Sequence, residues 1–142
     1  MKKTLLFSCL LLFSTLCFAQ ESLTWKRIMN ISWERKFNKQ YNEYINYPKF
    51  SEDVKSLNGK EVTIKGYVMP VEVNGDYMVI SAFPYENCFF CGGAGPESVM
   101  EVYLKDKKPV YSTQVKVKGT LQLNADDVDH LVFLLKDAVV VN

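Results

Sequence analysis

At 142 residues, with 48% hydrophobic and 23% charged content, the chain has room for one ordered globular domain, which excludes a multidomain enzyme. Its formal net charge of +1 includes Lys2 and Lys3, which precede a long apolar run. Without these two, 15 of the 17 basic residues remain against 16 acidic ones, a net charge of −1. This balance gives nucleic acid or anionic lipid no electrostatic attraction.

Residues 1–19 have the three parts of a signal peptide: a positively charged start, an apolar run over 4–13, and small residues at Cys17 and Ala19. The apolar stretch of about 15 residues is shorter than the roughly 20 that span a bilayer. We therefore expect cleavage after Ala19, a periplasmic or otherwise exported mature protein, and no stable membrane insertion after cleavage. Lipidation is disfavoured because Cys17 follows a bulky leucine and Cys9 lies too early in the apolar run.

Residues 20–58 form an aromatic-rich N-terminal extension. We expect a short helix and one or two strands here, with rings packed against the main body, because large aromatic side chains are most often buried. The alternative, a ligand-binding aromatic face, is less favoured. At its end, residues 51–57 should form a short helix, since Ser51 can act as the N-cap and Gly59 supplies a stop.

From residue 59 onward, hydrophobic residues alternate with polar ones, as they do in β-strands. The Asn-Gly-Asp sequence at 74–76 predicts the turn of a hairpin. Residues 84–95, rich in glycine and without periodicity, predict a loop, and the last strand is expected to bend near Asp137. The predicted strands are 62–68, 77–82, 99–104, 115–123 and 131–141.

Two of these strands carry nearly the same motif, VTIKG at 62–66 and VKVKG at 115–119. A glycine inside a strand permits the bend by which one strand serves both halves of a closed barrel, and closure removes exposed edges. The pattern over 59–141 resembles the OB-fold, although 106–113 leave little room for the helix that usually follows its third strand. We therefore expect an all-β fold with minor α content, in which a small five-stranded OB-like barrel occupies 59–142.

Signal cleavage would leave only Cys88 and Cys91, which are separated by two residues, so that both sulfurs can point at one centre. The glycines after Cys91 permit the positive φ values that turn backbone N–H groups toward sulfur. In an exported protein such a pair favours a disulfide, whose role would be to hold the shape of the loop. Its direct stabilisation would be modest, because the closed loop is very small.

A site for zinc or another transition metal is the second interpretation, because Cys-x-x-Cys-Gly resembles one knuckle of a zinc ribbon. Cys88 and Cys91 supply only half of a tetrahedral ligand set. His130 is the only histidine, although a lone histidine beside an acidic turn is also typical of an ordinary surface residue. The candidates for the missing ligands are His130, Glu97, Asp126, Asp127 and Asp129, or residues of a second chain.

Thiol–disulfide exchange is the third interpretation, with Cys88 as nucleophile and Cys91 as resolving thiol. Such enzymes activate their cysteine at the N-terminus of a helix in a βαβ unit, and no helix is expected after this loop. Covalent haem is excluded because Gly92 follows Cys91 where a histidine is required. A single histidine permits no Ser/His/Asp arrangement, and no phosphate-binding glycine motif is present, so we favour a role without catalysis.

Three motifs together resemble a group of short exported proteins of unassigned function from Bacteroidetes-type bacteria: GKEVTIKGYVMP at 59–70, CFFCGGAGPE at 88–97 and GTLQLN at 119–124. More distantly, the chain is similar to a broader OB-like bacterial family of unknown function whose loop contains Cys-x-His before a run of prolines. In that comparison Cys88 matches the cysteine, Phe90 takes the histidine position and Cys91 is extra. The resemblance implies a metal-compatible loop and relatives near membrane transport systems for transition metals. The proline run is missing here.

These features predict an exported OB-like binding or accessory module that serves a membrane or periplasmic protein partner, in connection with a membrane transport system. Its cysteine loop is expected either to bind a transition metal or to form a structural disulfide. Oligonucleotide binding, a frequent role of OB barrels, is disfavoured by the charge balance and by export.

Overall fold

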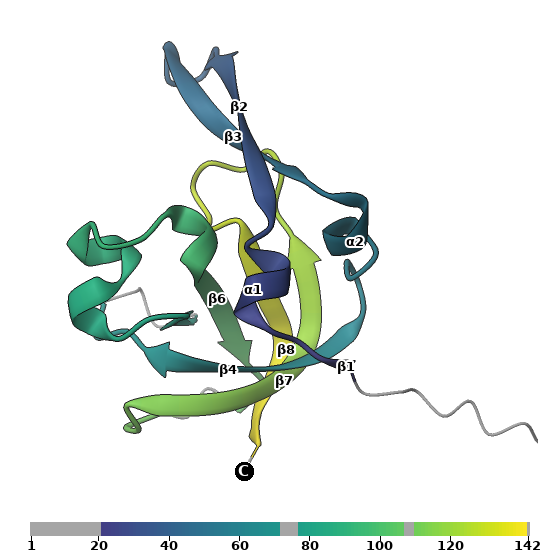
Figure 1. Cartoon of the computed structure of the whole chain (residues 1–142), viewed down its shortest axis with the longest axis vertical. Helices are drawn as coiled ribbons and strands as arrows, with labels where there is room; N and C mark the ends of the chain where they lie inside the picture. The colour runs from purple at the N-terminus through teal and green to yellow at the C-terminus, as the bar shows by residue number, and fades with distance from the viewer. Residues whose placement is uncertain (1–20, 72–76, 107–109, 142) are drawn as a thin grey trace, which may run out of the picture.

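A computed structural model describes residues 21–71, 77–106 and 110–141 (Figure 1). The predicted signal peptide and the Asn-Gly-Asp turn at 74–76 lie outside these ranges. Within them, no helix combines the length and hydrophobicity needed to cross a membrane.

Five strands form a closed mixed barrel, which confirms the expected all-β fold with minor helix content and its OB-like build. Around the barrel the order is β4-β5-β6-β8-β7, and β7 pairs with β4 to close it. The β6–β8 pair is parallel and the other pairs are antiparallel. The strands are β4 (Glu61–Val68), β5 (Met78–Ser81), β6 (Val99–Leu104), β7 (Gln114–Leu123) and β8 (Phe133–Val141).

The two similar glycine motifs close the barrel by pairing with each other. Ile64 lies opposite Val117, and Gly66 lies opposite Val115. Just past Gly66, β4 turns from β7 to β5, where Tyr67 pairs with Ser81. A Cβ atom on Gly66 would lie 3.0 Å from the Ser81 carbonyl oxygen, so a side chain would crowd this crossing.

The predicted bend near Asp137 is also present. Asp137 has a positive φ of 51°, and the β7–β8 register shifts between Lys118 and Thr120. An irregularity of this kind lets a long strand curve around a small barrel. The final strand, β8, therefore stays continuous while it pairs with β6 along one edge and with β7 along the other.

The N-terminal extension adds short elements that cover one end of the barrel. The elements are β1 (Glu21–Ser22), α1 (Trp25–Ile28) and α2 (Glu52–Lys55), and β1 pairs in parallel with β4. The Ser51 side chain caps α2 by accepting the Val54 N–H, and Gly59 has the positive φ of 75° that the predicted stop requires. Ile28 and Val54 are fully buried in the barrel core.

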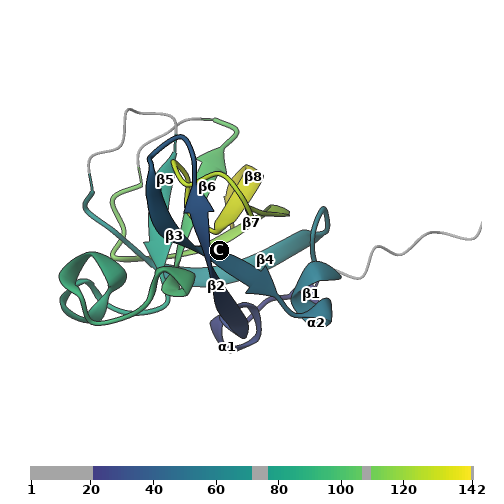
Figure 2. The same ribbon diagram turned by 90° about the horizontal axis from the view of Figure 1, so that it is seen from above.

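A separate hairpin, β2 (Ile31–Asn38) and β3 (Glu43–Phe50), projects from the barrel as an arm (Figures 1 and 2). Its base is anchored by Phe50, which is buried with its ring 6.1 Å from that of Phe133. The expectation that its rings would pack against the main body was largely wrong, because the hairpin leaves the core soon after this anchor. Four large aromatic side chains of the arm are exposed: Trp33, Phe37, Tyr41 and Tyr44.

Candidate binding pocket and cysteine loop

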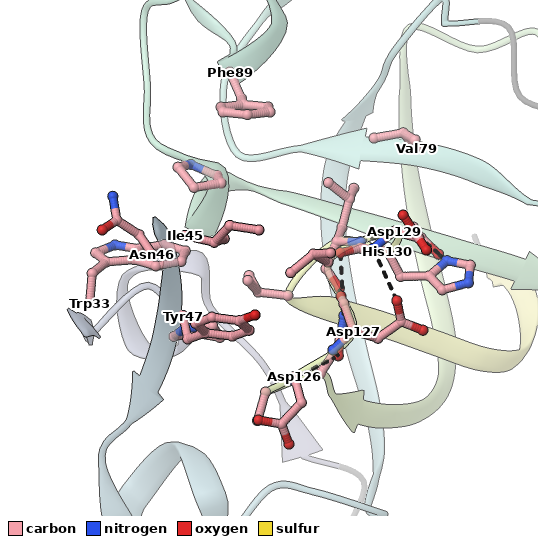
Figure 3. Close-up of a pocket in the computed structure, with 18 of the residues that line it drawn as sticks. Trp33, Ile45, Asn46, Tyr47, Val79, Phe89, Asp126, Asp127, Asp129 and His130 are labelled. Carbon is pink, nitrogen blue, oxygen red and sulfur yellow. Dashed lines mark hydrogen bonds and ion pairs between the residues drawn. The ribbon is translucent and has the colours of Figure 1, made fainter. Parts of the chain in front are cut away.

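A cavity of about 450 Å³ lies between the projecting hairpin and the barrel (Figure 3). Trp33 and Tyr47 line it from the hairpin, and Val79 and Glu101 line it from β5 and β6. The loop at 124–132 supplies another wall. The second and third barrel strands, together with the loop between the fourth and fifth, form the face on which OB barrels bind oligonucleotides and oligosaccharides.

Asn124 organises the loop that forms this wall. Its Oδ1 atom accepts the backbone N–H of Asp126 and of Asp127, at 3.3 and 3.0 Å. Its Nδ2 atom donates to backbone carbonyls further along the loop, including that of Leu131 at 3.1 Å. The neighbouring aspartates therefore belong to an Asx-type turn, as their spacing indicates.

A buried carboxylate, Glu101, lies beneath the pocket. Only 1% of the residue is exposed, and its Oε1 accepts the Leu131 backbone N–H at 2.7 Å. Its Oε2 accepts the Tyr103 hydroxyl at 2.6 Å and lies 3.1 Å from Nδ1 of His130. These contacts give hydrogen-bond partners to a carboxyl group whose burial would otherwise be costly. They also tie the loop at 124–132 to strand β6.

The tip of the hairpin is fastened to the same loop. The Tyr41 hydroxyl donates a hydrogen bond of 2.6 Å to Oδ1 of Asp129. That bond raises the pKa of Tyr41, with smaller contributions from desolvation and from the charges of Asp129 and Asp127. The hairpin thus spans the pocket from its anchor at Phe50 to this contact.

The cysteine loop forms the remaining wall, and it is more ordered than the sequence suggests. Two short 3-10 turns, η1 (Tyr85–Asn87) and η2 (Phe89–Cys91), lie in the segment 84–95 where a loop without regular structure was expected, and a third, η3 (Pro96–Ser98), follows it. Phe89 and Phe90, the two residues between the cysteines, both line the pocket. Their rings meet edge to face, with centroids 5.4 Å apart.

The two cysteines are unbonded in the structure and have different surroundings. Cys88 is fully buried beside Val79 and Val99, whereas Cys91 is exposed. Desolvation raises the pKa of Cys91, and the charge and hydrogen bonding of the neighbouring Cys88 raise it further, while a hydrogen bond from Tyr85 opposes them. The accessible thiol is therefore less often a thiolate than an ordinary cysteine.

The backbone of the loop bonds to itself rather than to sulfur. The N–H groups of Cys91 and Gly93 both point to the Cys88 carbonyl, at 3.2 and 3.1 Å, and that of Gly92 points to the Phe89 carbonyl. Gly92 has the expected positive φ, 77°. Its backbone conformation thus confirms the predicted glycine geometry, but the amides are not turned toward sulfur as expected for a metal knuckle.

His130 is not placed with the cysteines. It bonds to Glu101, while Cys88 and Cys91 lie in the separate turn η2 and its cap. Across residues 21–71, 77–106 and 110–141, no three His, Cys, Asp or Glu side chains gather in a way that could hold a metal ion. The structure therefore does not assemble the expected set of Cys88, Cys91 and His130 within one chain.

Sequence reasoning missed Glu101 and the hairpin wall. Glu101 lies in the strand VMEVYL between two fully buried residues, Met100 and Val102. A carboxylate flanked on both sides by buried apolar residues is unusual in a strand, and that pattern was the available signal. No comparable signal places Trp33 opposite the barrel face, because the position depends on the path of the whole arm.

Comparisons with known proteins support the fold. No protein-family model and no curated protein matches the chain. Among solved structures it is similar to the crystal structure of a DUF3299 family protein from Pseudomonas aeruginosa, with a TM-score of 0.52 and 13% sequence identity. The similarity covers 87% of this chain and 97% of that one. At this identity the likeness shows a shared small β fold.

Proposed function

We propose that the protein is an exported binding or accessory module whose ligand site is the pocket between the β2–β3 hairpin and the barrel. The carrying observation is that this cavity of about 450 Å³ lies on the binding face of an OB-like barrel. Its lining combines aromatic side chains with a few polar groups, the usual composition of a small-molecule site.

The exposed part of the hairpin supports a protein partner for the same module. Phe37 and Tyr44 are 49% and 62% exposed, and their rings lie edge to face on one side of the arm. Exposed aromatic residues of this kind are enriched in protein interfaces. A membrane or periplasmic partner, within a membrane transport system, would dock on this arm beside the pocket.

For the cysteine loop, the proposal is a structural disulfide between Cys88 and Cys91. The supports are the predicted export, the proximity of the two thiols and the position of Cys88 in an apolar cluster. Oxidation would remove two electrons and two protons from the thiols and pass them to a protein or small-molecule disulfide, which becomes a dithiol. The bridge would fix Phe89 and Phe90 in the pocket wall.

The other two interpretations of the loop have less support. Cys88 is buried and so is poorly accessible as a nucleophile, and the raised pKa of exposed Cys91 disfavours its thiolate. Zinc or another transition metal would need its remaining ligands from a second chain or a partner, since His130 is engaged with Glu101. The metal site and the oxidoreductase each predict a different result from a disulfide in the test of the cysteine loop described below.

The pocket is tested by fragment screening with two-dimensional ¹H–¹⁵N NMR on the mature protein. Binders should shift the indole N–H resonance of Trp33, identified with Trp33→Phe, because this ring lines the pocket. Trp25 is the internal control, since its indole N–H is bonded to the Lys65 carbonyl at 2.8 Å outside the pocket. A chemically diverse library that yields no binder, or only binders that shift residues elsewhere, would refute the proposed site.

The cysteine loop is tested on mature protein isolated without reductant or chelator. We expect an intact mass lower by two hydrogens than after reduction, no reaction with iodoacetamide before reduction, and no bound metal. After reduction, Cys91 should react first, slower at pH 7 than a free cysteine peptide, and faster as pH rises through its raised pKa. Stoichiometric zinc that is lost in Cys88→Ser would instead establish the metal site, and turnover of a disulfide substrate such as insulin would establish the oxidoreductase.

A further inference from the structure

From the charges around the pocket, we infer that it selects an organic cation with an apolar body, an inference that rests on the proposed binding function. Among the described residues that line the cavity, four are carboxylates and none is lysine or arginine. The carboxylates are Glu101, Asp126, Asp127 and Asp129. An anionic ligand would therefore meet repulsion on entry.

The hydrogen bonds that Asp127 and Asp129 accept come from neutral groups. Asp127 accepts a neutral backbone N–H from Asp129, and Asp129 accepts the neutral hydroxyl of Tyr41. Glu101 accepts the neutral Leu131 N–H and Tyr103 hydroxyl, and its Oε2 lies 3.1 Å from Nδ1 of His130. The ammonium group of Lys136 does not line the cavity but lies at an adjoining smaller hollow that shares Asp127 and His130 with it. Desolvation lowers the pKa of Lys136, and the charge of Glu101 partly offsets this, so Glu101 already has a cationic neighbour. A ligand that carries its own positive charge would supply a counter-charge to the three aspartates of the loop.

The aromatic lining favours the same class of ligand. Rings from the hairpin and from the cysteine loop lie on different sides of the cavity, with Trp33 and Tyr47 on the hairpin and Phe89 in the cysteine loop (Figure 3). Aromatic faces attract ammonium and guanidinium groups through their quadrupole, and they also bury an apolar body. A neutral sugar would use the rings and could donate hydroxyl hydrogen bonds to the carboxylates, but it would gain no charge–charge attraction from them.

The test compares three probes that share one ring and differ in charge: 2-phenylethylammonium, 2-phenylethanol and phenylacetate. Each is titrated into the mature, oxidised protein at low ionic strength, with the Trp33 indole N–H as the reporter. We expect the cation to bind roughly fivefold or more tightly than the alcohol, and the anion to bind most weakly. The cation's advantage should shrink as salt is added.

Charge-neutralising variants locate the effect. Asp126→Asn with Asp127→Asn removes two charges but keeps the oxygens that the loop uses, so it should lose most of the preference for the cation. The matched control, Glu52→Gln with Asp137→Asn, removes two exposed carboxylates that do not line the pocket and should keep the preference. Equal binding of alcohol and cation at Trp33 would overturn the inference while leaving the binding site intact. If none of the three probes binds, the inference is overturned. The fragment screen then shows separately whether the pocket binds any ligand.

Discussion

Glu101→Ala should lower the free energy of unfolding by about 3 kcal/mol, the cost of breaking a buried, hydrogen-bonded charged group. The carboxylate is 1% exposed, and its removal would leave the Leu131 N–H and the Tyr103 hydroxyl without this acceptor. His130 contributes less, because 41% of its side chain is exposed and water can replace the lost bond. The measurement is urea unfolding of the oxidised mature protein.

Two companion variants separate the network from its charge. Glu101→Gln keeps an acceptor oxygen of nearly the same shape and should lose about half as much stability. Glu61→Ala removes an exposed strand glutamate whose partner is Lys118, and should change stability by no more than about 0.5 kcal/mol. If Glu101→Ala unfolds at the same urea concentration as the wild type, the carboxylate does not hold the loop to the barrel.

The barrel could be predicted from sequence because its determinants are local and repeated. The breaker sequence at 106–109 bounded β6 at the residues where it is found, and the shared glycine motif indicated a closed barrel, which the pairing of β4 with β7 completes. Asp137 was identified as a bend because polar residues interrupt an otherwise apolar strand. In each case the signal lies within a few residues of the feature, and a closed barrel is the architecture that satisfies all of them.

The pocket could not be predicted in the same way, because its walls meet through contacts between distant segments. Tyr41 and Asp129 are 88 residues apart, and Glu101 and Leu131 are 30 apart. The cysteine motif drew attention to two sulfur atoms, whereas the structure shows Phe90 and its neighbour between them facing the cavity. The Cys-x-x-Cys motif identifies two reactive sulfur atoms, but it does not show that the residues between them line a pocket.

Gly119→Ala should destabilise the barrel by about 2–3 kcal/mol, the upper range for forcing extra volume into a packed interior. A Cβ atom at Gly119 would lie 2.7 Å from the Lys136 carbonyl oxygen and 3.1 Å from Cα of Ala138. Both are backbone atoms of β8, so repacking a side chain cannot relieve the contact. The sign of the stability change is informative. Alanine in place of glycine inside an unobstructed strand usually stabilises the protein by about 0.5–1 kcal/mol, so a loss of stability would point to the close contact.

The control for this prediction is Gly59→Ala. Gly59 has a positive φ of 75° and nothing within 4 Å of the added Cβ, so its cost is conformational, about 1 kcal/mol. Gly119→Ala should therefore be clearly the less stable variant by urea unfolding. It should also loosen β7 against β8, seen as faster hydrogen exchange of the amides of the paired residues Gln122 and Leu134. Because β8 also pairs with β6, which carries Glu101, the disturbance should reach the pocket and weaken binding there. A Gly119→Ala protein as stable as wild type would mean that β7 and β8 are farther apart than the register shift at Lys118 and Thr120 places them.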